Sequence, residues 1–340
     1  DRLQDLAMRL QAQGMQLEQY LQMTGATPEG FSQELRDTAT SAVKVDLALR
    51  AVAEAEGIEC TDEDLEQEYA QVAERLNLTT ATLNQMLTML ELDGLLDLHQ
   101  LVRTRIPIKG ETRVSTSVFE RDSGREYRFV TNGPVVSPSE WQACLDSVAE
   151  ARCDYLVVSG SLPPGTPDDF YARVSGSANE RGIRVVLDSS GPGLAQGLAG
   201  RGIFLVKPSI GELRSLTGLD LASDEAIAEA AEAIVRRGEA EHVAVTMGRD
   251  GALLANASGV LRLPAIPVEA ASAVGAGDSF LAAMVHALAS GQEAADAFRF
   301  GLAAGAAAAL SPGTDLAAPE DIRRLAAASG HLLMSETGAT

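Results

Sequence analysis

The chain has 340 residues, with 48 Asp and Glu against 27 Lys and Arg, which gives a formal net charge of −21 at pH 7. This acidity argues against nucleic acid and anionic membranes as partners, because both are negatively charged and attract basic patches. The three cysteines form no CxxC pair, so neither a disulfide framework nor a zinc site is indicated, and we expect a cytoplasmic protein.

Composition divides the chain into two parts. Residues 1–100 carry a charge balance of −13 and 5 glycines, whereas residues 101–340 carry a balance of −8 and 26 glycines. A chain of this length can form two domains. The longest apolar run, residues 301–310, is too short to cross a membrane.

The first part has the spacing of amphipathic helices. Thr27-Pro28 pairs a helix-capping residue with proline at the first helical position. Apolar residues recur at steps of three and four, as at Leu3, Leu6, Leu10, Val45 and Leu49. The pattern predicts an all-α segment with no evident catalytic group, which is typical of a helical interaction or scaffold segment.

Three stretches of this part resemble the C-terminal chaperone region of bacterial trigger factor, namely Tyr20–Gly25, Thr27–Phe31 and Val45–Ala53. The likeness covers about residues 8–80. It implies a helical arm that cradles unfolded chains, and this interpretation stands beside the scaffold interpretation.

Beyond residue 100 the periodicity changes to that of strands. Residues 114–119 and 126–130 are strand-like, and the turn cluster Asp122-Ser123-Gly124 separates them. We therefore predict a β-hairpin.

From residue 154 onward, strand-like and helix-like runs alternate. We predict strands at residues 155–158, 185–187, 203–206 and 243–246, and helices near 167–180, 209–217, 223–237 and from 278 onward. This alternation is typical of a mostly parallel sheet covered by helices. Ligands of such sheets bind at the carboxyl ends of the strands, so the polar residues that follow these strands are candidates for a site.

The segment Gly275-Ala276-Gly277-Asp278 precedes a helical run and is the strongest candidate for chemistry. Unpaired backbone N–H groups at a helix start attract anions, and glycine lets the backbone approach a phosphate group closely. Asp278 could take a proton from an attacking hydroxyl group while the amides stabilise the transferred phosphoryl group. Taken alone, however, the segment is better explained by Asp278 as an ordinary helix N-cap.

Other strand ends carry groups that suit a nucleotide. Glu212, just after Lys207-Pro208-Ser209, could hold Mg²⁺ through water, or it could simply be an acid in a first helical turn. The stretch Thr246–Gly251 could contact a phosphate group or form a simple hairpin turn. The small residues of Ala303–Ser311 could pack as a core helix or leave room for adenine.

Together and in order, these pieces resemble the PfkB family of ribokinase-like carbohydrate kinases, and most closely its phosphofructokinase members. The likeness covers about residues 85–328 and implies two domains, a helical segment at residues 1–84 and a kinase domain at residues 85–340. It implies a partial ribokinase-like, doubly wound α/β sheet with a β-hairpin lid, preceded by the all-α segment. The residues that carry it are Gly110–Arg113, Tyr127–Val130, Ser159–Gly165, Asp188–Gly191, Lys207–Leu213, Val274–Phe280 and Phe298–Thr314.

The resemblance also implies roles for individual residues. Asp278 would be the catalytic base, Gly275, Ala276 and Gly277 would form the anion hole, and Glu212 would serve Mg²⁺ through water. The remaining implied residues are Lys207, Ser209, Thr246, Gly248, Gly251 and Ser311 for ATP, Arg113, Arg128 and Ser161 for the sugar phosphate, and Ser272, Val274, Ala308 and Gly313 for a monovalent cation such as K⁺. Without the resemblance, the two arginines would be interpreted as exposed strand charges.

The implied function is ATP-dependent phosphorylation of a sugar phosphate, most closely that of fructose 6-phosphate to fructose 1,6-bisphosphate, by a homodimer joined through the hairpin lid. Residues 1–100 contain neither the Asn-Pro-Ala-x-Asp nor the Gly-Gly-Lys-Gly-x-Asn segment by which the family holds sugar. Two alternatives therefore stay open, a chain that binds nucleotide without turnover and a non-catalytic fusion with a chaperone-like arm. We also expect an exposed sheet edge where strands of the family fold are missing.

Overall fold

The computed structural model describes residues 44, 70–72, 74–75, 94–96, 98–110, 112–113, 115–120, 125–130, 133–311, 313 and 316–328, with the backbone alone for 115–120 and 125–130. The chain divides into two compact units, residues 1–101 and residues 102–340. The described residues of the first unit are mostly helical, as predicted. Most of the predicted helical arm, and the predicted boundary between residues 84 and 85, lie outside the described residues.

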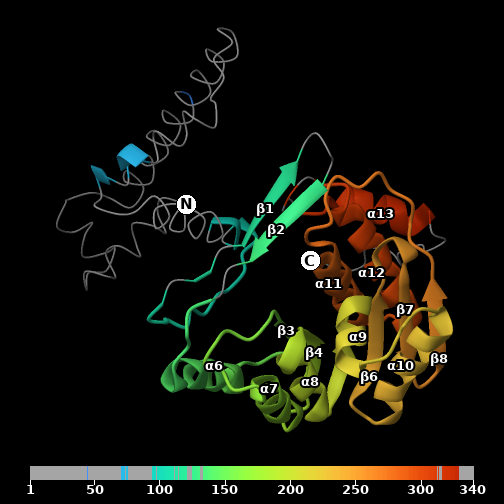
Figure 1. Ribbon diagram of the computed structural model, residues 1–340, viewed down its shortest axis with the longest axis horizontal. Coiled ribbons are helices and arrows are strands. Elements are labelled where there is room, and N and C mark those ends of the chain that lie inside the picture. The colour runs from blue at the N-terminus through green and yellow to red at the C-terminus, as the bar shows by residue number, and fades with distance from the viewer. Residues whose placement is uncertain are drawn as a thin grey trace, which may run out of the picture. The chain divides into compact units, whose positions relative to one another are not determined.

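The second unit begins with the predicted hairpin. Strand β1 (Ser115–Glu120) pairs antiparallel with β2 (Arg125–Val130), with Ser115 opposite Val130 and Glu120 opposite Arg125. The two strands form a sheet of their own (Figure 1).

The rest of the second unit alternates strands with helices. Its elements are α6 (Pro138–Glu150), β3 (Tyr155–Ser159), α7 (Phe170–Asn179), β4 (Arg184–Asp188), α8 (Gly191–Ala199), β5 (Ile203–Val206), α9 (Ile210–Thr217), α10 (Asp224–Arg236), β6 (Ala240–Thr246), the 3₁₀ turn η1 (Gly248–Asp250), β7 (Ala252–Asn256), β8 (Gly259–Leu263), α11 (Ala276–Ala289), α12 (Ala294–Ala308) and α13 (Pro319–Ala328).

Six strands form one mixed sheet in the order β3-β4-β5-β6-β7-β8. The first four are parallel, as predicted, whereas β7 and β8 are antiparallel additions that the sequence pattern did not reveal. Strand β7 is buried along nearly its whole length, so its residues do not alternate between apolar and polar types. Within the described part of the chain β3 is an outer strand, and its Val157 side chain is 48% exposed.

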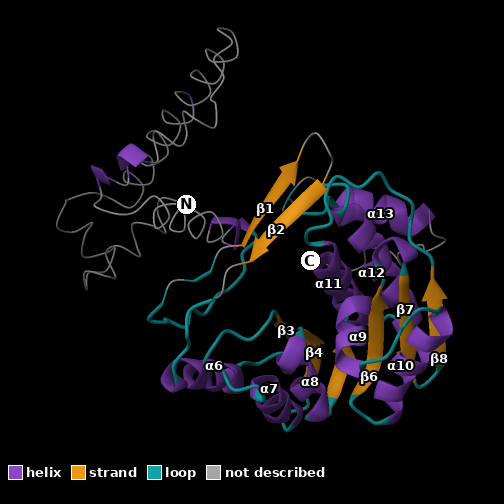
Figure 2. Ribbon diagram, viewed as in Figure 1, coloured by secondary structure: helices purple, strands orange, loops and turns teal. Residues whose placement is uncertain are grey.

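Helices cover both faces of this sheet (Figure 2). Val185 and Leu187 of β4 pack with α7, α8, α9 and α10, whereas Val186 between them packs with α11 and α12. Alternate residues of one strand thus belong to two apolar cores, which is the doubly wound arrangement expected from the sequence.

Helices α11 and α12 pack very closely. A Cβ atom on Gly301 would lie 2.8 Å from the carbonyl oxygen of Phe280, and one on Gly305 would lie 3.0 Å from that of Ala276. The alanines of α12 that face the core are at most 3% exposed, namely Ala303, Ala304, Ala307 and Ala308. The small residues therefore pack as part of a core helix, which is one of the two interpretations of the sequence. This close packing fixes the first turn of α11, whereas room for adenine stays a prediction.

None of the described helices is both long and apolar enough to cross a membrane.

Candidate active site

The carboxyl ends of the four parallel strands lie at one edge of the sheet and carry the predicted site residues. Strands β3, β4 and β6 end at Ser159, Asp188 and Thr246, and Lys207 directly follows β5. This is the edge at which open α/β sheets bind their ligands.

The start of α11 presents backbone amides that have no acceptor within the helix. Gly275 has φ 75°, a left-handed conformation that glycine adopts without strain, and its carbonyl oxygen accepts the first helical hydrogen bond from Ser279 at 2.8 Å. Gly275 is the N-cap, so Asp278 is the third residue of the helix and not the cap that the simplest interpretation of the sequence assumed. The N–H groups of a first helical turn have no acceptor within the helix and are available to an anion.

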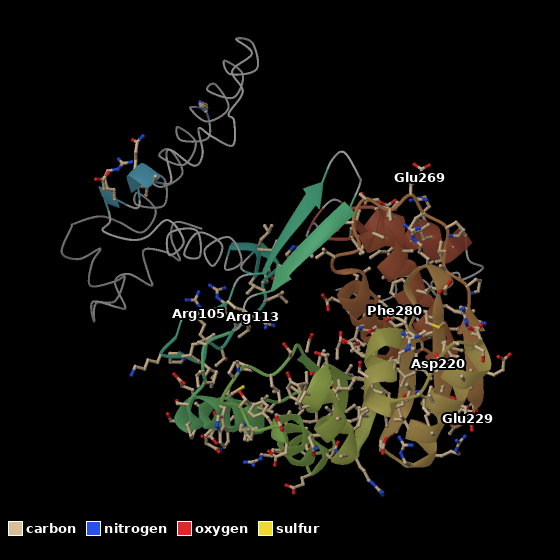
Figure 3. The ribbon with its side chains drawn as sticks, viewed as in Figure 1. Arg105, Arg113, Asp220, Glu229, Glu269 and Phe280 are labelled. Atoms are coloured by element: carbon tan, nitrogen blue, oxygen red, sulfur yellow. The ribbon has the colours of Figure 1, made fainter. Side chains whose placement is uncertain are left out.

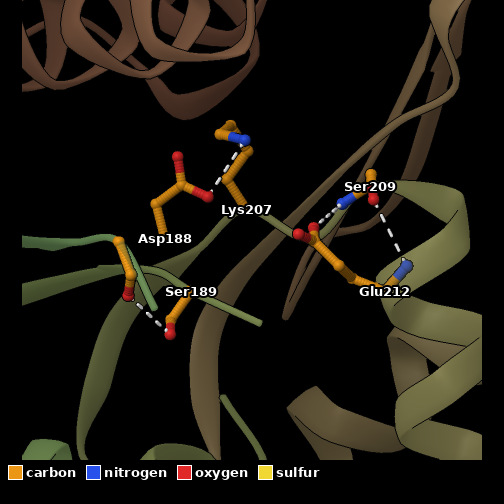
Figure 4. Close-up of polar contacts among 6 residues, drawn as sticks. Asp188, Ser189, Lys207, Ser209 and Glu212 are labelled. Carbon is orange, nitrogen blue, oxygen red and sulfur yellow. Dashed lines mark hydrogen bonds and ion pairs between the residues drawn. The ribbon is translucent and has the colours of Figure 1, made fainter. Parts of the chain in front are cut away.

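Lys207 brings a positive charge to this turn. Its side chain is only 7% exposed, and its Nζ atom lies 3.1 Å from Oδ1 of Asp188, whose side chain is 13% exposed (Figure 4). The same Nζ atom lies 3.3 Å from the point that a Cβ atom on Gly277 would occupy. The ammonium group therefore lies between the end of β4 and the amides of α11.

Two other carboxylates act on the ionisation of Asp188. Burial raises the pKa of Asp188 above its ordinary value, the Lys207 charge opposes the rise, and the negative charges of Asp278 and Glu212 add to it. Sequence reasoning placed Asp188 in a family motif but gave it no role in the site. Its position directly after the predicted strand at residues 185–187 was the signal that could have identified it.

Glu212 is the third residue of α9 and forms a capping box with the N-cap residue Ser209. The Ser209 N–H donates to Oε2 of Glu212 at 2.7 Å, and the Glu212 N–H donates to Oγ of Ser209 at 3.2 Å (Figure 4). Glu212 thus stabilises the helix start whether or not it also serves a cation. Within the described part of the chain no cluster of three or more His, Cys, Asp or Glu side chains could hold a metal ion unaided.

The predicted ATP residues after β6 lie beside this helix start. Thr246 forms a parallel bridge with Ser209, and its N–H donates to the Pro208 carbonyl oxygen at 3.0 Å. Gly248 and Gly251 both have positive φ, 57° and 97°, in a tight turn between β6 and β7. The backbone therefore forms the turn that the alternative interpretation proposed, and a contact with ATP stays a prediction.

Two of the predicted sugar-phosphate residues meet although 48 positions separate them. Nη2 of Arg113 donates to Oγ of Ser161 at 3.1 Å, and Arg113 lies in the segment before β1 (Figure 3). The Gly160 carbonyl oxygen accepts hydrogen bonds from the hydroxyl groups of Tyr171 and Ser189 at 2.7 and 2.9 Å, which fixes the loop that carries Ser161. The third predicted residue, Arg128, lies opposite Ser117 in the hairpin, and its side chain is outside the described residues.

The residues predicted to bind a monovalent cation come from two segments that the fold joins. The Ala271 N–H donates to the Ala309 carbonyl oxygen at 2.8 Å, which places Ser272 beside the end of α12, and the Val274 N–H donates to Oγ of Ser272 at 3.1 Å. Ser311, predicted to contact ATP, donates from its N–H to the Ala308 carbonyl oxygen at 3.1 Å. Carbonyl oxygens gathered at such a junction are the donors that K⁺ prefers.

Comparison with known proteins identifies both parts of the chain. Residues 93–321 match the family described as pfkB family carbohydrate kinase, and residues 1–105 match the family described as bacterial trigger factor protein (TF) C-terminus. The chain is 40% identical over 221 residues to the ATP-dependent 6-phosphofructokinase isozyme 2 of Mycobacterium tuberculosis (strain ATCC 25618 / H37Rv), which covers 64% of this chain and 65% of that protein. The chain thus spans a little under two thirds of that relative's length.

The fold is similar to that of phosphofructokinase-2 from Escherichia coli. The crystal structure of that enzyme in complex with potassium gives a TM-score of 0.67 at 35% identity, and covers 71% of this chain and 78% of that one. Its complex with fructose-6-phosphate gives a TM-score of 0.65 at 34% identity with the same coverage. These likenesses confirm the predicted fold class, and the two family matches confirm the resemblances seen in the sequence.

Proposed function

The chain belongs to the pfkB family of carbohydrate kinases, and from that premise we propose that it transfers the terminal phosphoryl group of ATP to a hydroxyl group of fructose 6-phosphate, giving ADP and fructose 1,6-bisphosphate. The observation that carries the proposal is the first turn of α11, where the amides after Gly275, the carboxylate of Asp278 and the ammonium group of Lys207 come together. Phosphoryl transfer needs this combination of an anion site, a proton acceptor and a neutralising charge.

Asp278 acts as the base in this proposal. It takes the proton of the attacking sugar hydroxyl as the new O–P bond forms and the bond to the leaving ADP oxygen breaks. The amides of residues 275–277 and the Lys207 ammonium group stabilise the negative charge on the transferred group. Ser209, Thr246, Gly248, Gly251 and Ser311 hold the rest of the nucleotide.

Mg²⁺ fits the oxygen donors of this site. Glu212 supplies a carboxylate whose charge acts on Asp188, and Mg²⁺ commonly takes one or two carboxylates together with water and nucleotide phosphates. When bound, the ion neutralises phosphate charge. Ser272, Val274, Ala308 and Gly313 are the proposed donors for K⁺, and that ion is present in the potassium complex of the E. coli enzyme.

Fructose 6-phosphate is the substrate favoured by the 6-phosphofructokinase relatives, at 37–40% identity, over the 1-phosphofructokinases, at 30–35% identity. The M. tuberculosis protein is named for that reaction, and the E. coli enzyme has been crystallised with fructose-6-phosphate. Arg113, held by Ser161, and Arg128 are the proposed phosphate contacts, because guanidinium groups bind phosphate in a bidentate manner. The hairpin that carries Arg128 would also join two copies of the chain, since an isolated two-stranded sheet has little stability of its own.

A second candidate function is nucleotide binding without turnover, with the trigger-factor-like segment as a chaperone arm. The match of residues 1–105 to the trigger factor family favours it, and so does the absence of the family's two sugar-binding segments from residues 1–100.

A substrate comparison tests the proposal. ADP release is measured with saturating Mg-ATP and with fructose 6-phosphate, fructose 1-phosphate or tagatose 6-phosphate. We expect the highest kcat/KM with fructose 6-phosphate. Calorimetric Mg-ATP binding with no turnover of any of the three sugars would support the second candidate instead.

A further inference from the structure

The ion pair between Asp188 and Lys207 joins two neighbouring strands at their carboxyl ends. The Lys207 N–H donates to the Leu187 carbonyl oxygen at 3.1 Å, so the two side chains start from adjacent points of β4 and β5. Their charged atoms then meet at 3.1 Å in a place where both side chains are nearly buried. This pair is distinct from the surface ion pairs of the chain, such as Arg173 with Asp169, whose side chains are 46% and 48% exposed.

A lysine in this position needs a partner. A lysine side chain is a flexible four-carbon stem that ends in a compact, strongly hydrated charge. Its own conformational preferences therefore do not fix the position of the ammonium group. Burying such a charge costs several kcal/mol unless an opposite charge compensates it. Asp188 supplies that opposite charge, and it fixes the ammonium group at the amides of α11.

Gly277, which faces the Lys207 ammonium group, has no side chain and so leaves room for that group. A Cβ atom at Gly277 would lie 3.3 Å from Nζ of Lys207, closer than most contacts of a Cβ atom. Glycine at this position therefore lets the ammonium group approach the helix start, where the proposed function places the transferred phosphoryl group.

We propose that Asp188 is a positioning residue, which contacts neither substrate but holds the Lys207 ammonium group against the first turn of α11 so that it faces the nucleotide phosphates. This role rests on the proposed function, because it supposes that phosphate binds at α11. It assigns to Asp188 an effect on nucleotide affinity that passes entirely through Lys207.

A double-mutant cycle tests that dependence. Calorimetry gives the Mg-ATP affinity of the wild-type chain, Asp188→Asn, Lys207→Met and the double variant. We expect each single change to weaken binding by roughly 10- to 100-fold, the usual effect of losing one charged hydrogen bond. We expect the double variant to bind no more weakly than Lys207→Met alone. If Asp188→Asn weakens binding by the same factor in both backgrounds, Asp188 acts on the ligand directly and the inference is wrong.

A second readout needs no ligand. The chain has three lysines, Lys44, Lys109 and Lys207, so ¹³C-lysine labelling gives three Cε signals, and the one lost in Lys207→Met is assigned. We expect Asp188→Asn to shift the Lys207 signal and to leave the other two in place. An unchanged Lys207 signal would overturn the inference even if the wild-type chain binds nucleotide.

The two experiments separate the two claims. A wild-type chain that binds no Mg-ATP removes the proposed function and this role with it, whereas binding with independent effects of the two substitutions removes only the role. Folding of each variant is checked by the fluorescence of Trp141, the single tryptophan of the chain. Trp141 packs against the core of the second unit, residues 102–340, which we call the kinase unit. If Asp188→Asn does not fold, the same cycle is run with Asp188→Ser.

Discussion

Glu212 and Ser209 hold each other at the start of α9, with the Ser209 N–H donating to Oε2 of Glu212 at 2.7 Å and the Glu212 N–H donating to Oγ of Ser209 at 3.2 Å. The same carboxylate lies close enough to Asp188 to raise the pKa of that residue. One side chain therefore has a structural task and, in the proposed function, a task in binding Mg²⁺. The two tasks differ in what they require, because a cap needs only a hydrogen-bond acceptor whereas a cation needs a negative charge.

Glu212→Gln separates these tasks. The amide oxygen of Gln can still accept from Ser209, so we expect the free energy of unfolding to change by less than about 0.5 kcal/mol. We expect the Mg²⁺ concentration for half-maximal activity to rise several-fold, because the charge is lost.

The matched control is Glu140→Gln, which makes the same change in the capping box of α6, where the Ser137 N–H donates to Oε2 of Glu140 at 2.6 Å. We expect Glu140→Gln to leave the Mg²⁺ concentration for half-maximal activity unchanged. An equal rise in both variants, or in neither, would contradict a role for Glu212 in cation binding.

Gly251→Ala should strongly destabilise the kinase unit. Gly251 has φ 97°, and a Cβ atom there would lie 2.2 Å from the carbonyl oxygen of Leu263, so both strain and a backbone clash result. We expect a loss of about 3 kcal/mol or more, at the upper end of what strained backbone positions cost. The measurement is urea unfolding followed by Trp141 fluorescence.

Gly248→Ala is the control for the clash. Gly248 also has positive φ, 57°, but has no neighbour within 4 Å of the added atom, so a loss of about 1–2 kcal/mol is expected from strain alone. Equal losses in the two variants would show that the contact with Leu263 is unimportant.

His242 should make stability depend on pH. It packs against Phe204, with ring centroids 5.0 Å apart, and burial lowers its pKa below the ordinary 6.5, an effect that the nearby Glu241 opposes. The folded state thus prefers the neutral ring. Its stabilising contribution is fully present above pH 6.5 and is lost as the pH falls toward the lower folded-state pKa.

The free energy of unfolding at pH 7.5 and pH 5.5 checks this. We expect the wild-type chain to lose more stability between these two values than His242→Gln does. His286→Gln, a change at an exposed histidine of α11, serves as the reference and should follow the wild-type chain. A His242→Gln variant that keeps the full pH dependence would assign the effect to other groups.

Much of the fold could be predicted because local pattern and tertiary structure agree. The strand at Ile203–Val206 and the helix starts near Ser209 and Ser223 follow directly from apolar runs and capping residues. Strand β7 could not be predicted, because burial on both faces removes the alternation that identifies a strand.

The site was only partly visible in the sequence. The Gly275–Asp278 turn was found because glycines and an acid before a helical run can form an anion site, although alone they fit a helix cap as well, and the other motifs of the family decided between the two. The contacts of Arg113 with Ser161 and of Lys207 with Asp188 depend on the order of strands in the sheet, which no local pattern encodes. For that reason Asp188 and Lys207 were both found in family motifs, but the ion pair between them was not predicted.

Asp278→Asn should separate binding from chemistry. The change keeps the size of the side chain and removes the proton acceptor, so we expect kcat to fall by about 10²- to 10⁴-fold, the usual contribution of a general base. We expect calorimetric Mg-ATP affinity to stay within a few-fold of the wild-type value. A large loss of affinity with little further loss of kcat would assign Asp278 to nucleotide binding.

Fructose 6-phosphate-dependent ADP release, compared between the wild-type chain and Asp278→Asn at saturating Mg-ATP, tests the proposed phosphotransfer most directly. We expect turnover in the wild-type chain that requires the sugar phosphate and is lost in the variant. A wild-type rate no higher than that of Asp278→Asn would contradict a kinase activity of this chain.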